Sequence, residues 1–187
     1  MAEKLVLTPE DDGKTHINIY SQGKTKLGKD LSNFGHFPFV HKEHGAFASV
    51  EGYWYWLTRQ DERLRHAHGF EAKQLGQSLP EVKRWHSEKF ESLIKEALAA
   101  KLERNHGMAK ALAETTIPLT HYYAKYYDGK LKVTQPRGSD FILAFFEEYR
   151  LKHNPEADAS TLNKLEAQRE KAIRAKEEEP SQIGFGF

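Results

Sequence analysis

Glu51 is the residue whose surroundings most strongly suggest chemistry. It lies in Ser49-Val50-Glu51-Gly52-Tyr53-Trp54, at the second position of a helix that Ser49 is expected to cap, among apolar and aromatic residues. The unpaired N–H groups and the dipole of a helix start favour a carboxylate by about 0.3–1 kcal/mol. We therefore expect an ionised carboxylate, suited to stabilising a developing cation or activating water. The alternative is an ordinary first-turn glutamate that only starts the helix.

A second group of candidates lies in Gly23-Lys24-Thr25-Lys26-Leu27-Gly28-Lys29-Asp30. Two glycines separated by four residues and followed by Lys29 nearly complete a phosphate-binding loop, but Asp30 stands where that motif needs a Ser or Thr hydroxyl for magnesium. We therefore do not expect a nucleoside triphosphatase. A milder hypothesis is that this loop lets Lys24 and Lys29 touch a substrate phosphate, and the alternative is a solvated loop.

The histidines raise the question of a metal site. His41, Glu43 and His44 lack the helical spacing of a zinc-peptidase motif, and His66 and His68 are two residues apart, which would place them on different sides of a helix. They are expected to be surface or core-edge histidines, and we expect neither a metal nor another cofactor. The sequence also lacks the Gly-x-Ser-x-Gly turn that many serine hydrolases carry.

Composition limits the class of protein. The chain has 187 residues, of which 39% are hydrophobic, so it can form one domain of ordinary size. Its formal net charge of +1 argues against a protein held to nucleic acid mainly by phosphate neutralisation. It has no cysteine, no apolar run near the roughly 20 residues of a membrane helix and no signal-peptide core. We expect a soluble, cytoplasmic protein without a membrane partner.

Apolar residues recur at helical spacing in four segments. The long second helix is expected to end at Asn105-His106-Gly107, since glycine readily takes the left-handed conformation that ends helices. The first expected helix follows Ser49 and buries Val50, Trp54 and Leu57. The second runs from Val82 to about Arg104, and the third covers Met108 to Glu114. The fourth follows Ser139 and buries Phe141, Ile142, Phe145, Phe146 and Tyr149.

Strand patterns occupy the segments between these helices. Alternation over His16–Tyr20 predicts a half-buried strand, and Phe37–His41 is expected to return through Ala46–Phe47. Asp128-Gly129 is a strong signal for a tight hairpin turn between strands over Tyr122–Tyr127 and Lys130–Thr134.

Past residue 152 the composition changes to Glu, Lys, Arg and Ala with few large aliphatic residues. We therefore expect a domain over residues 1–152 and a charged helical arm and tail over residues 153–187. The apolar end, Ile183–Phe187, could dock on a protein partner, and the alternative is a frayed tail.

Four segments, in their order and separation, resemble the NADAR family, also called YbiA-like. They are Leu31-Ser32-Asn33-Phe34, Ser49-Val50-Glu51-Gly52-Tyr53, Ala72-Lys73-Gln74-Leu75-Gly76 and the long helix that follows, and the resemblance runs from about Ile17 to Arg150. It implies an α+β fold, mostly helical around a small sheet, that hydrolyses N-glycosidic bonds. The expected substrate is ADP-ribosylated guanine in nucleic acid or a nucleotide.

The resemblance also implies roles for individual residues. Glu51 falls on the catalytic glutamate of the family, and Lys73 falls on its central Lys/Gly element, where it would bind phosphate or attack the opened sugar as an amine. Two features depart from the family pattern: Gly52 replaces a common histidine and could widen the pocket, and the tyrosine-rich hairpin replaces a Trp-Gly-acidic element. The expected substrate contacts are Ser32, Asn33, Phe34, Tyr53, Trp54 and Gly76, together with Lys24 and Lys29.

Two alternative functions stay open. The first is an N-glycosidase acting on ribosylated intermediates of riboflavin synthesis, with a phosphoribosylated small molecule as its partner. The second is a non-catalytic module that binds nucleotides or nucleic acid by stacking bases on the hairpin tyrosines, assisted by the charged arm. Release of free ADP-ribose from ADP-ribosylated guanine would separate the enzyme from the binding module.

Overall fold

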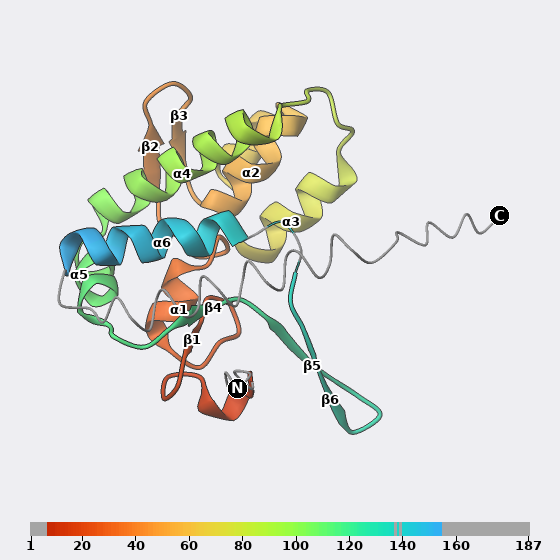
Figure 1. Cartoon of the computed structure of the whole chain (residues 1–187). Helices are drawn as coiled ribbons and strands as arrows, with labels where there is room; N and C mark the ends of the chain where they lie inside the picture. Colours follow the sequence, from red (N-terminus) through yellow and green to blue (C-terminus); the bar gives the residue numbers. More distant parts are fainter. Residues whose placement is uncertain (1–6, 137, 139, 155–187) are drawn as a thin grey trace.

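The molecule consists of helices connected through three short two-stranded sheets (Figure 1). A computed structural model describes residues 7–136, 138 and 140–154. In chain order the elements are η1 (Pro9–Asp11), β1 (Ile17–Asn18), α1 (Lys26–Leu31), β2 (Phe39–His41), β3 (Gly45–Phe47), α2 (Val50–Arg59), η2 (Glu62–Arg65), α3 (Gly69–Ser78), α4 (Ser87–Arg104), α5 (His106–Glu114), β4 (Leu119–Thr120), β5 (Tyr123–Tyr127), β6 (Lys130–Thr134) and α6 (Asp140–His153).

The fold is α+β and mostly helical, as expected, but its strands do not form one small sheet. β1 pairs with β4 in parallel, while β2–β3 and β5–β6 are separate antiparallel hairpins. The β1–β4 and β2–β3 pairs are covered by helices and not extended by further strands: α1 packs against β1, α6 against β4 and α4 against β2. None of the helices within the described residues has the length and apolar content of a membrane span.

Helix α2 lies at the centre of the core, against α3 and α4 (Figure 1). Its buried face differs from the expected stripe, because Tyr53 and Trp56 join Val50 and Leu57 there while Trp54 is only half-buried. Trp54 packs instead at the contact of α2 with α4 and α6. The α4 residues that complete the core are Leu93, Ile94, Ala97, Leu98 and Leu102.

The segment expected to be a half-buried strand is buried on both faces. Residues 16–19 are all buried, and the polar members find partners inside the protein. The Asn18 carboxamide donates to the Tyr122 carbonyl and accepts from the Tyr122 amide, each at 3.0 Å, and a ring nitrogen of His16 lies 2.8 Å from the Tyr122 hydroxyl. Alternation therefore marks buried polar pairing here, not solvent exposure.

The expected Gly/Lys loop is helical at its end. Thr25 caps α1, since its hydroxyl oxygen accepts from the Gly28 amide at 3.0 Å. The capping threonine in the motif-like sequence was the overlooked signal.

The long helix begins five residues later than expected. The amides of Val82 and Lys83 both donate to the Thr58 carbonyl, at 2.9 and 3.1 Å, and the Trp85 indole donates to the Leu57 carbonyl at 2.8 Å. These bonds hold residues 82–86 extended along the end of α2, so α4 starts only at Ser87. It ends at Arg104, as expected.

The break between α4 and α5 falls at Asn105. Its side-chain nitrogen donates to the Lys101 carbonyl at 2.7 Å, whereas Gly107 lies inside α5 and does not end a helix. The α5 helix covers the expected segment with two more residues at its start.

Both hairpins expected from the sequence are present. Asp128 and Gly129 form the turn between β5 and β6 with φ angles of 48° and 74°. Helix α6 is present over Asp140–His153, and its buried apolar residues are Ile142, Leu143 and Phe146. The expected cap at Ser139, the charged arm and the Ile183–Phe187 tail lie outside the described residues.

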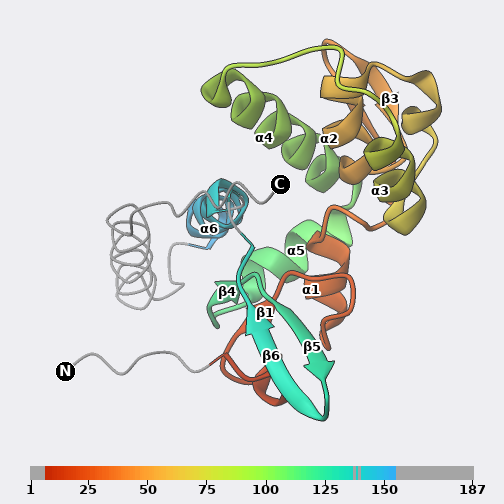
Figure 2. The ribbon, with the colours of Figure 1, turned by 90° about the vertical axis from the view of Figure 1, so that its right-hand side faces the viewer.

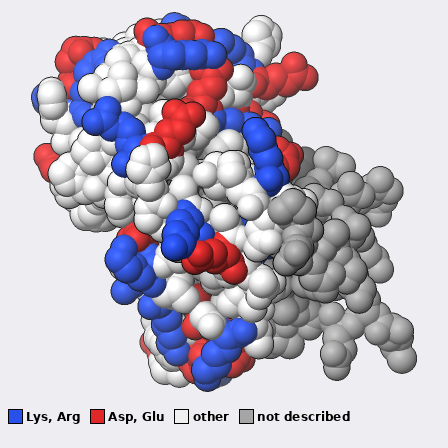
Figure 3. All heavy atoms as spheres, turned by 90° about the vertical axis from the view of Figure 1, so that its left-hand side faces the viewer, with Lys and Arg blue, Asp and Glu red and all other residues white. Residues whose placement is uncertain are grey.

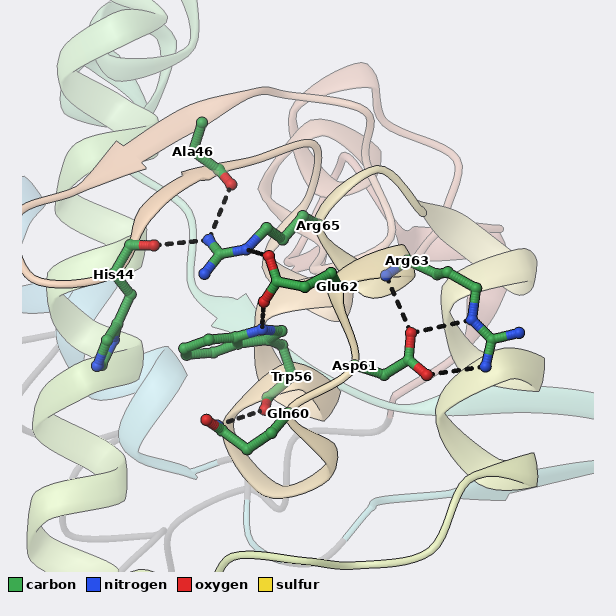
Figure 4. Close-up of polar contacts among 8 residues, drawn as sticks. All are labelled: His44, Ala46, Trp56, Gln60, Asp61, Glu62, Arg63 and Arg65. Carbon is green, nitrogen blue, oxygen red and sulfur yellow. Dashed lines mark hydrogen bonds and ion pairs between the residues drawn. The ribbon is translucent and has the colours of Figure 1, made fainter.

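An arginine-centred cluster fixes the chain that follows α2 (Figure 4). The Arg65 guanidinium donates to the His44 carbonyl and to the Glu62 carboxylate, both at 2.6 Å, and it lies over the Phe47 and Trp56 rings. Glu62 also accepts from the Trp56 indole at 3.0 Å. These contacts join η2 to α2 and to the β2–β3 hairpin, and so support the helix start that carries Glu51.

The chain that follows α2 packs closely against Gly52. A Cβ atom there would lie 2.3 Å from the Leu64 carbonyl oxygen and 2.9 Å from that of Ala67, so Gly52 allows the chain to pack closely and does not widen a pocket. We expect Gly52→Ala to lower the free energy of unfolding by about 1–3 kcal/mol in chemical denaturation. Gly107→Ala is the control, because nothing lies within 4 Å of its added Cβ, and it should be neutral or stabilising. Equal losses in both variants would contradict the close packing.

Candidate active site

The start of α2 brings the expected motifs together. The Ser49 hydroxyl accepts from the Gly52 amide at 3.0 Å and donates to the Ala67 carbonyl at 2.9 Å. The Glu51 amide donates to the Asn33 carbonyl at 3.0 Å, and the next carbonyl, that of Phe34, accepts from Gly69 at the start of α3. The segments around residues 33, 51 and 73 therefore lie side by side, although they are far apart in the sequence.

The Glu51 side chain is mostly buried, and its carboxyl forms no hydrogen bond with the part of the chain that the structure describes. Burial raises the pKa of Glu51 to about 7, and the positive charge of Lys73 lowers it in part. The helix start therefore does not keep the pKa of Glu51 low, and at neutral pH the carboxyl is divided between its ionised and protonated forms instead of being fully ionised as expected. The amides of residues 51 and 52 are bonded to Asn33 and Ser49, so they do not face the carboxyl.

Lys73 projects from α3 next to the Ser32–Phe34 segment. Its ammonium lies 5.9 Å from the centre of the Phe34 ring, a cation–π distance, and its charge acts on Glu51. Asn33 and Phe34 are half-buried, and the Asn33 carboxamide has no hydrogen bond to another described residue. The Asn33 carboxamide thus remains able to donate and accept hydrogen bonds to a ligand.

Two tyrosines complete the surroundings of Glu51: Tyr55, which sequence reasoning missed, and Tyr123, which it considered only among the hairpin tyrosines of the non-catalytic alternative. Burial, followed by the negative charge of Glu51, raises the pKa of Tyr55 and of Tyr123. Tyr55 lies one helical turn after Glu51, a spacing that could have revealed it. Tyr123 comes from β5, packs edge-on against Tyr20 with ring centres 5.1 Å apart, and carried no such signal.

Gly76 supports Tyr55 and is not placed as a substrate contact. A Cβ atom at Gly76 would lie 2.0 Å from Cγ of Tyr55, so the ring occupies the space of the missing side chain. The Gly76 carbonyl accepts from Nε of Arg59 at 3.0 Å, which joins α3 to α2. The Lys/Gly element therefore supplies one residue to the site, Lys73, and one packing position, Gly76.

The expected contacts Tyr53 and Trp54 are packing residues. Tyr53 is completely buried, and its hydroxyl lies 2.8 Å from Nδ1 of His44. Trp54 packs edge-on against Phe90 and parallel to Phe141. Tyr53, two positions after Glu51, points to a different side of the helix, and Trp54, three positions after Glu51, is held by the Phe90 and Phe141 rings.

Lys101, a buried residue of α4, holds the Ser32–Phe34 segment from the core side. Its completely buried ammonium donates to the Ser32 carbonyl at 2.9 Å and lies 5.2 Å from the Phe37 ring centre. Burial lowers the pKa of Lys101 to about 7. Ser32 is itself buried, and its hydroxyl oxygen has no partner in the described part of the chain, so the structure gives it no exposed surface for a large ligand.

Lys24 and Lys29 are exposed, and neither is a charge that acts on Glu51. Lys24 follows β1, and its ammonium lies 3.3 Å from the Glu10 carbonyl, while Lys29 projects from α1. Among the described residues, Lys73 is the cation whose charge acts on Glu51. The expected phosphate contacts through Lys24 and Lys29 are not brought to the glutamate.

Three of the four histidines that suggested a metal site, His41, His44 and His68, stack on or pack against other rings, whereas His66 is exposed. The buried His41 places Nε2 3.2 Å from a Glu96 oxygen and stacks on Tyr53. His68 stacks on His36 with ring centres 4.4 Å apart. Within the described residues no three His, Asp or Glu side chains are grouped to hold a metal ion.

A hollow of about 280 Å³ lies beside the β2–β3 hairpin and includes neither Glu51 nor Lys73. It is mainly apolar, with two arginines and a histidine among its lining residues, which are Pro38, Phe39, Val40, Ala46, Phe47, Ala48, Arg65, His66 and Arg104.

The arrangement described above is that of a known α+β fold. Among solved structures it is similar to the NMR structure of the E. coli protein YbiA, with a TM-score of 0.53 and 23% sequence identity over 81% of this chain and 88% of the YbiA chain. No protein-family model and no curated protein matches the sequence. The chain therefore has a YbiA-like fold.

The raised pKa of Glu51 makes stability depend on pH. Between its ordinary value of 4.5 and about 7 the folded state binds the proton more tightly than the unfolded chain, so stability is lost as pH rises through this window. We expect Glu51→Gln to remove this loss: above pH 7 its free energy of unfolding should exceed that of the parent by up to about 3 kcal/mol, and it should unfold at a higher temperature. The two should converge below pH 4.5.

Thermal unfolding from pH 4 to 8 measures this difference. Glu88→Gln, an exposed first-turn glutamate of α4, is the matched control and should show no such trend. A constant difference between Glu51→Gln and the parent across the range would contradict the raised pKa.

Proposed function

We propose that the chain is an N-glycosidase that hydrolyses a ribose–nitrogen bond, and that its activity is removal of ADP-ribose from modified guanine. The observation that carries the proposal is the Glu51 carboxyl, mostly buried, without a hydrogen-bond partner among the described residues, and close enough to Lys73 for its pKa to be affected. Strongly shifted groups of this kind concentrate at active sites. The YbiA-like fold supports the same class through the motif resemblance.

The chemistry requires a base close to neutral pH. As the bond from ribose to nitrogen breaks, positive charge develops at the anomeric carbon and the bonding electron pair stays on the leaving nitrogen. Ionised Glu51 stabilises this charge and takes a proton from the water whose oxygen bonds to the anomeric carbon. Protonated Glu51 then releases that proton to the leaving nitrogen, which regenerates the carboxylate. A pKa of about 7 fits both steps, because the group can hold and release the proton at neutral pH.

The neighbouring side chains have distinct proposed roles. Lys73 binds a substrate phosphate as a point charge, and it favours the ionised form of Glu51. The Asn33 carboxamide contacts ribose hydroxyls. Phe34, Tyr55 and Tyr123 provide rings on which a base can stack.

The first test is turnover by Glu51→Gln. The amide is close in size to the carboxyl but can neither accept the proton nor stabilise the cation, so we expect loss of at least about 100-fold in kcat with the fold retained. The assay offers ADP-ribosylated oligonucleotide, ADP-ribosylguanosine and ribosylated riboflavin intermediates in parallel and measures the released sugar.

Glu88→Gln serves as the active control, with circular dichroism as the check on folding. Glu51-dependent turnover of the riboflavin intermediates alone would replace guanine as the substrate while keeping the reaction. Substrate binding without turnover of any of the three would support the non-catalytic module. A fully active Glu51→Gln would remove the catalytic assignment.

The second test is the pH profile of Lys73→Met. Because the charge of Lys73 lowers the pKa of Glu51, removing it should move the acidic limb of kcat/KM to higher pH and raise KM for phosphate-bearing substrates. Lys73→Arg keeps the charge and should keep the limb near that of the parent. An adduct trapped by borohydride in the parent and lost in Lys73→Arg would instead show that Lys73 attacks the opened sugar.

A further inference from the structure

The β5–β6 hairpin projects from the rest of the molecule (Figures 1 and 2). Its two strands contact each other far more than they contact any other element, and the residues on both sides of its turn are exposed. Tyr126 and Tyr127 expose 68% and 56% of their surface. Since the hairpin contributes little to the core, the choice of large aromatic side chains at its tip is not explained by folding.

The cross-strand register divides the hairpin into two faces. Successive side chains of a strand point to opposite sides, so the pairs Tyr123↔Thr134, Lys125↔Lys132 and Tyr127↔Lys130 share one face, which we call the basic face. The pairs Ala124↔Val133 and Tyr126↔Leu131 form the opposite face, which carries no charge.

The basic face contains an unfavourable pair of like charges. Lys125 and Lys132 are directly opposite each other, a placement that destabilises a hairpin. Neither they nor Lys130 has a carboxylate partner among the described residues, and Asp128 in the turn is the one acidic residue between Tyr123 and Thr134. Such a face is stabilised by an anion that lies between the two ammonium groups.

The charge of this face differs from that of the surface at the left of Figure 1, where β2 and α5 lie. There, blue and red side chains alternate (Figure 3). Elsewhere on the molecule, Lys42 pairs with Glu96 at 3.3 Å and Lys89 pairs with Glu43 at 3.9 Å. Other exposed lysines, such as Lys14 and Lys29, also lack an ion-pair partner, so the feature that distinguishes the basic face is the placement of two lysines directly opposite each other.

The basic face is continuous with the candidate active site. Tyr123, at its base, packs against Tyr20 and is close enough to Glu51 for the two side chains to interact electrostatically. From there the face passes through Lys125 and Lys132 to Tyr127 and Lys130 at the tip, with alternate residues of one strand about 6–7 Å apart. Aromatic rings and cations thus alternate along a path leading away from Glu51.

We propose that the basic face of the β5–β6 hairpin binds a single-stranded polynucleotide next to the modified base, so that a modified base within a strand is a better substrate than a free nucleotide or nucleoside. This inference rests on the proposed function. Stacking on tyrosines tolerates any base, and lysines neutralise the phosphates between them, which is how single strands are held without sequence preference.

Fluorescence anisotropy with a labelled unmodified 12-nucleotide single strand tests the surface without requiring catalysis. In the parent we expect binding that weakens with salt. In Lys125→Gln/Lys132→Gln the slope of log K against log salt should fall by about 1.4, because each phosphate contact contributes about 0.7 on a single strand. Lys42→Gln/Lys89→Gln removes the same charge elsewhere and is the matched control. Equal losses in both double variants would overturn the proposal.

Two neighbouring tyrosines distinguish the faces. Tyr127→Ala should weaken binding about five-fold or more, because it removes a stacking ring from the basic face, while Tyr126→Ala on the opposite face should leave it unchanged. The reverse order, or no effect of either, would overturn the proposal. DNA and RNA strands of one sequence, tested side by side, separate the two sources of the same chemistry.

Turnover separates this inference from the proposed function. If both hold, Lys125→Gln/Lys132→Gln lowers kcat/KM on the ADP-ribosylated strand and leaves that on ADP-ribosylguanosine unchanged. Equal turnover of the strand by parent and variant overturns the surface while keeping the enzyme. Lack of turnover on either substrate, with hairpin-dependent strand binding retained, overturns the enzyme and keeps the surface.

Discussion

A mostly buried carboxyl without a hydrogen-bond donor among the described residues is the constraint on which this structure depends. The amides at the start of α2, which usually stabilise an acidic side chain, are bonded to the Ser49 hydroxyl and the Asn33 carbonyl. Those two bonds fix the helix start against its neighbours, and they leave Glu51 with Lys73 as its nearby counter-charge among the described residues. The same bonds that position the glutamate therefore keep its proton affinity high.

The raised pKa of Glu51 lowers the stability of the fold at neutral pH, a cost that is common at active sites. The surrounding structure compensates by rigid support. Arg65 donates to the His44 carbonyl and to the Glu62 carboxylate, and so joins the β2–β3 hairpin to η2. The buried ammonium of Lys101 donates to the Ser32 carbonyl. Neither side chain contacts Glu51, yet both hold the backbone on which it and its neighbours are placed.

Local signals in the sequence predicted local structure. Ser49 marked the start of α2, and Asp128-Gly129 marked the hairpin turn, because a cap and a tight turn depend on residues close in the chain. The motif spacing also brought Glu51 and Lys73 to attention, and the fold places them in electrostatic contact. Their roles in a reaction are still proposals.

What the sequence could not reveal depends on contacts between distant segments. Trp54 and Tyr53 have similar apolarity, so the pattern did not show that Tyr53 points into the core. The late start of α4 follows from bonds to the Thr58 carbonyl. Tyr123 reaches the site from a hairpin more than seventy positions after Glu51. Burial, which sets the pKa of Glu51, is likewise a property of the assembled fold.

Titration of Glu51 by NMR, with the side-chain carboxyl carbon labelled and assigned by comparison with Glu51→Gln, tests the central claim most directly. The structure predicts a midpoint near pH 7 for this single glutamate. A midpoint near 4.5, the ordinary value, would contradict the account, because it would show a carboxyl that is solvated or hydrogen-bonded and not buried without a donor.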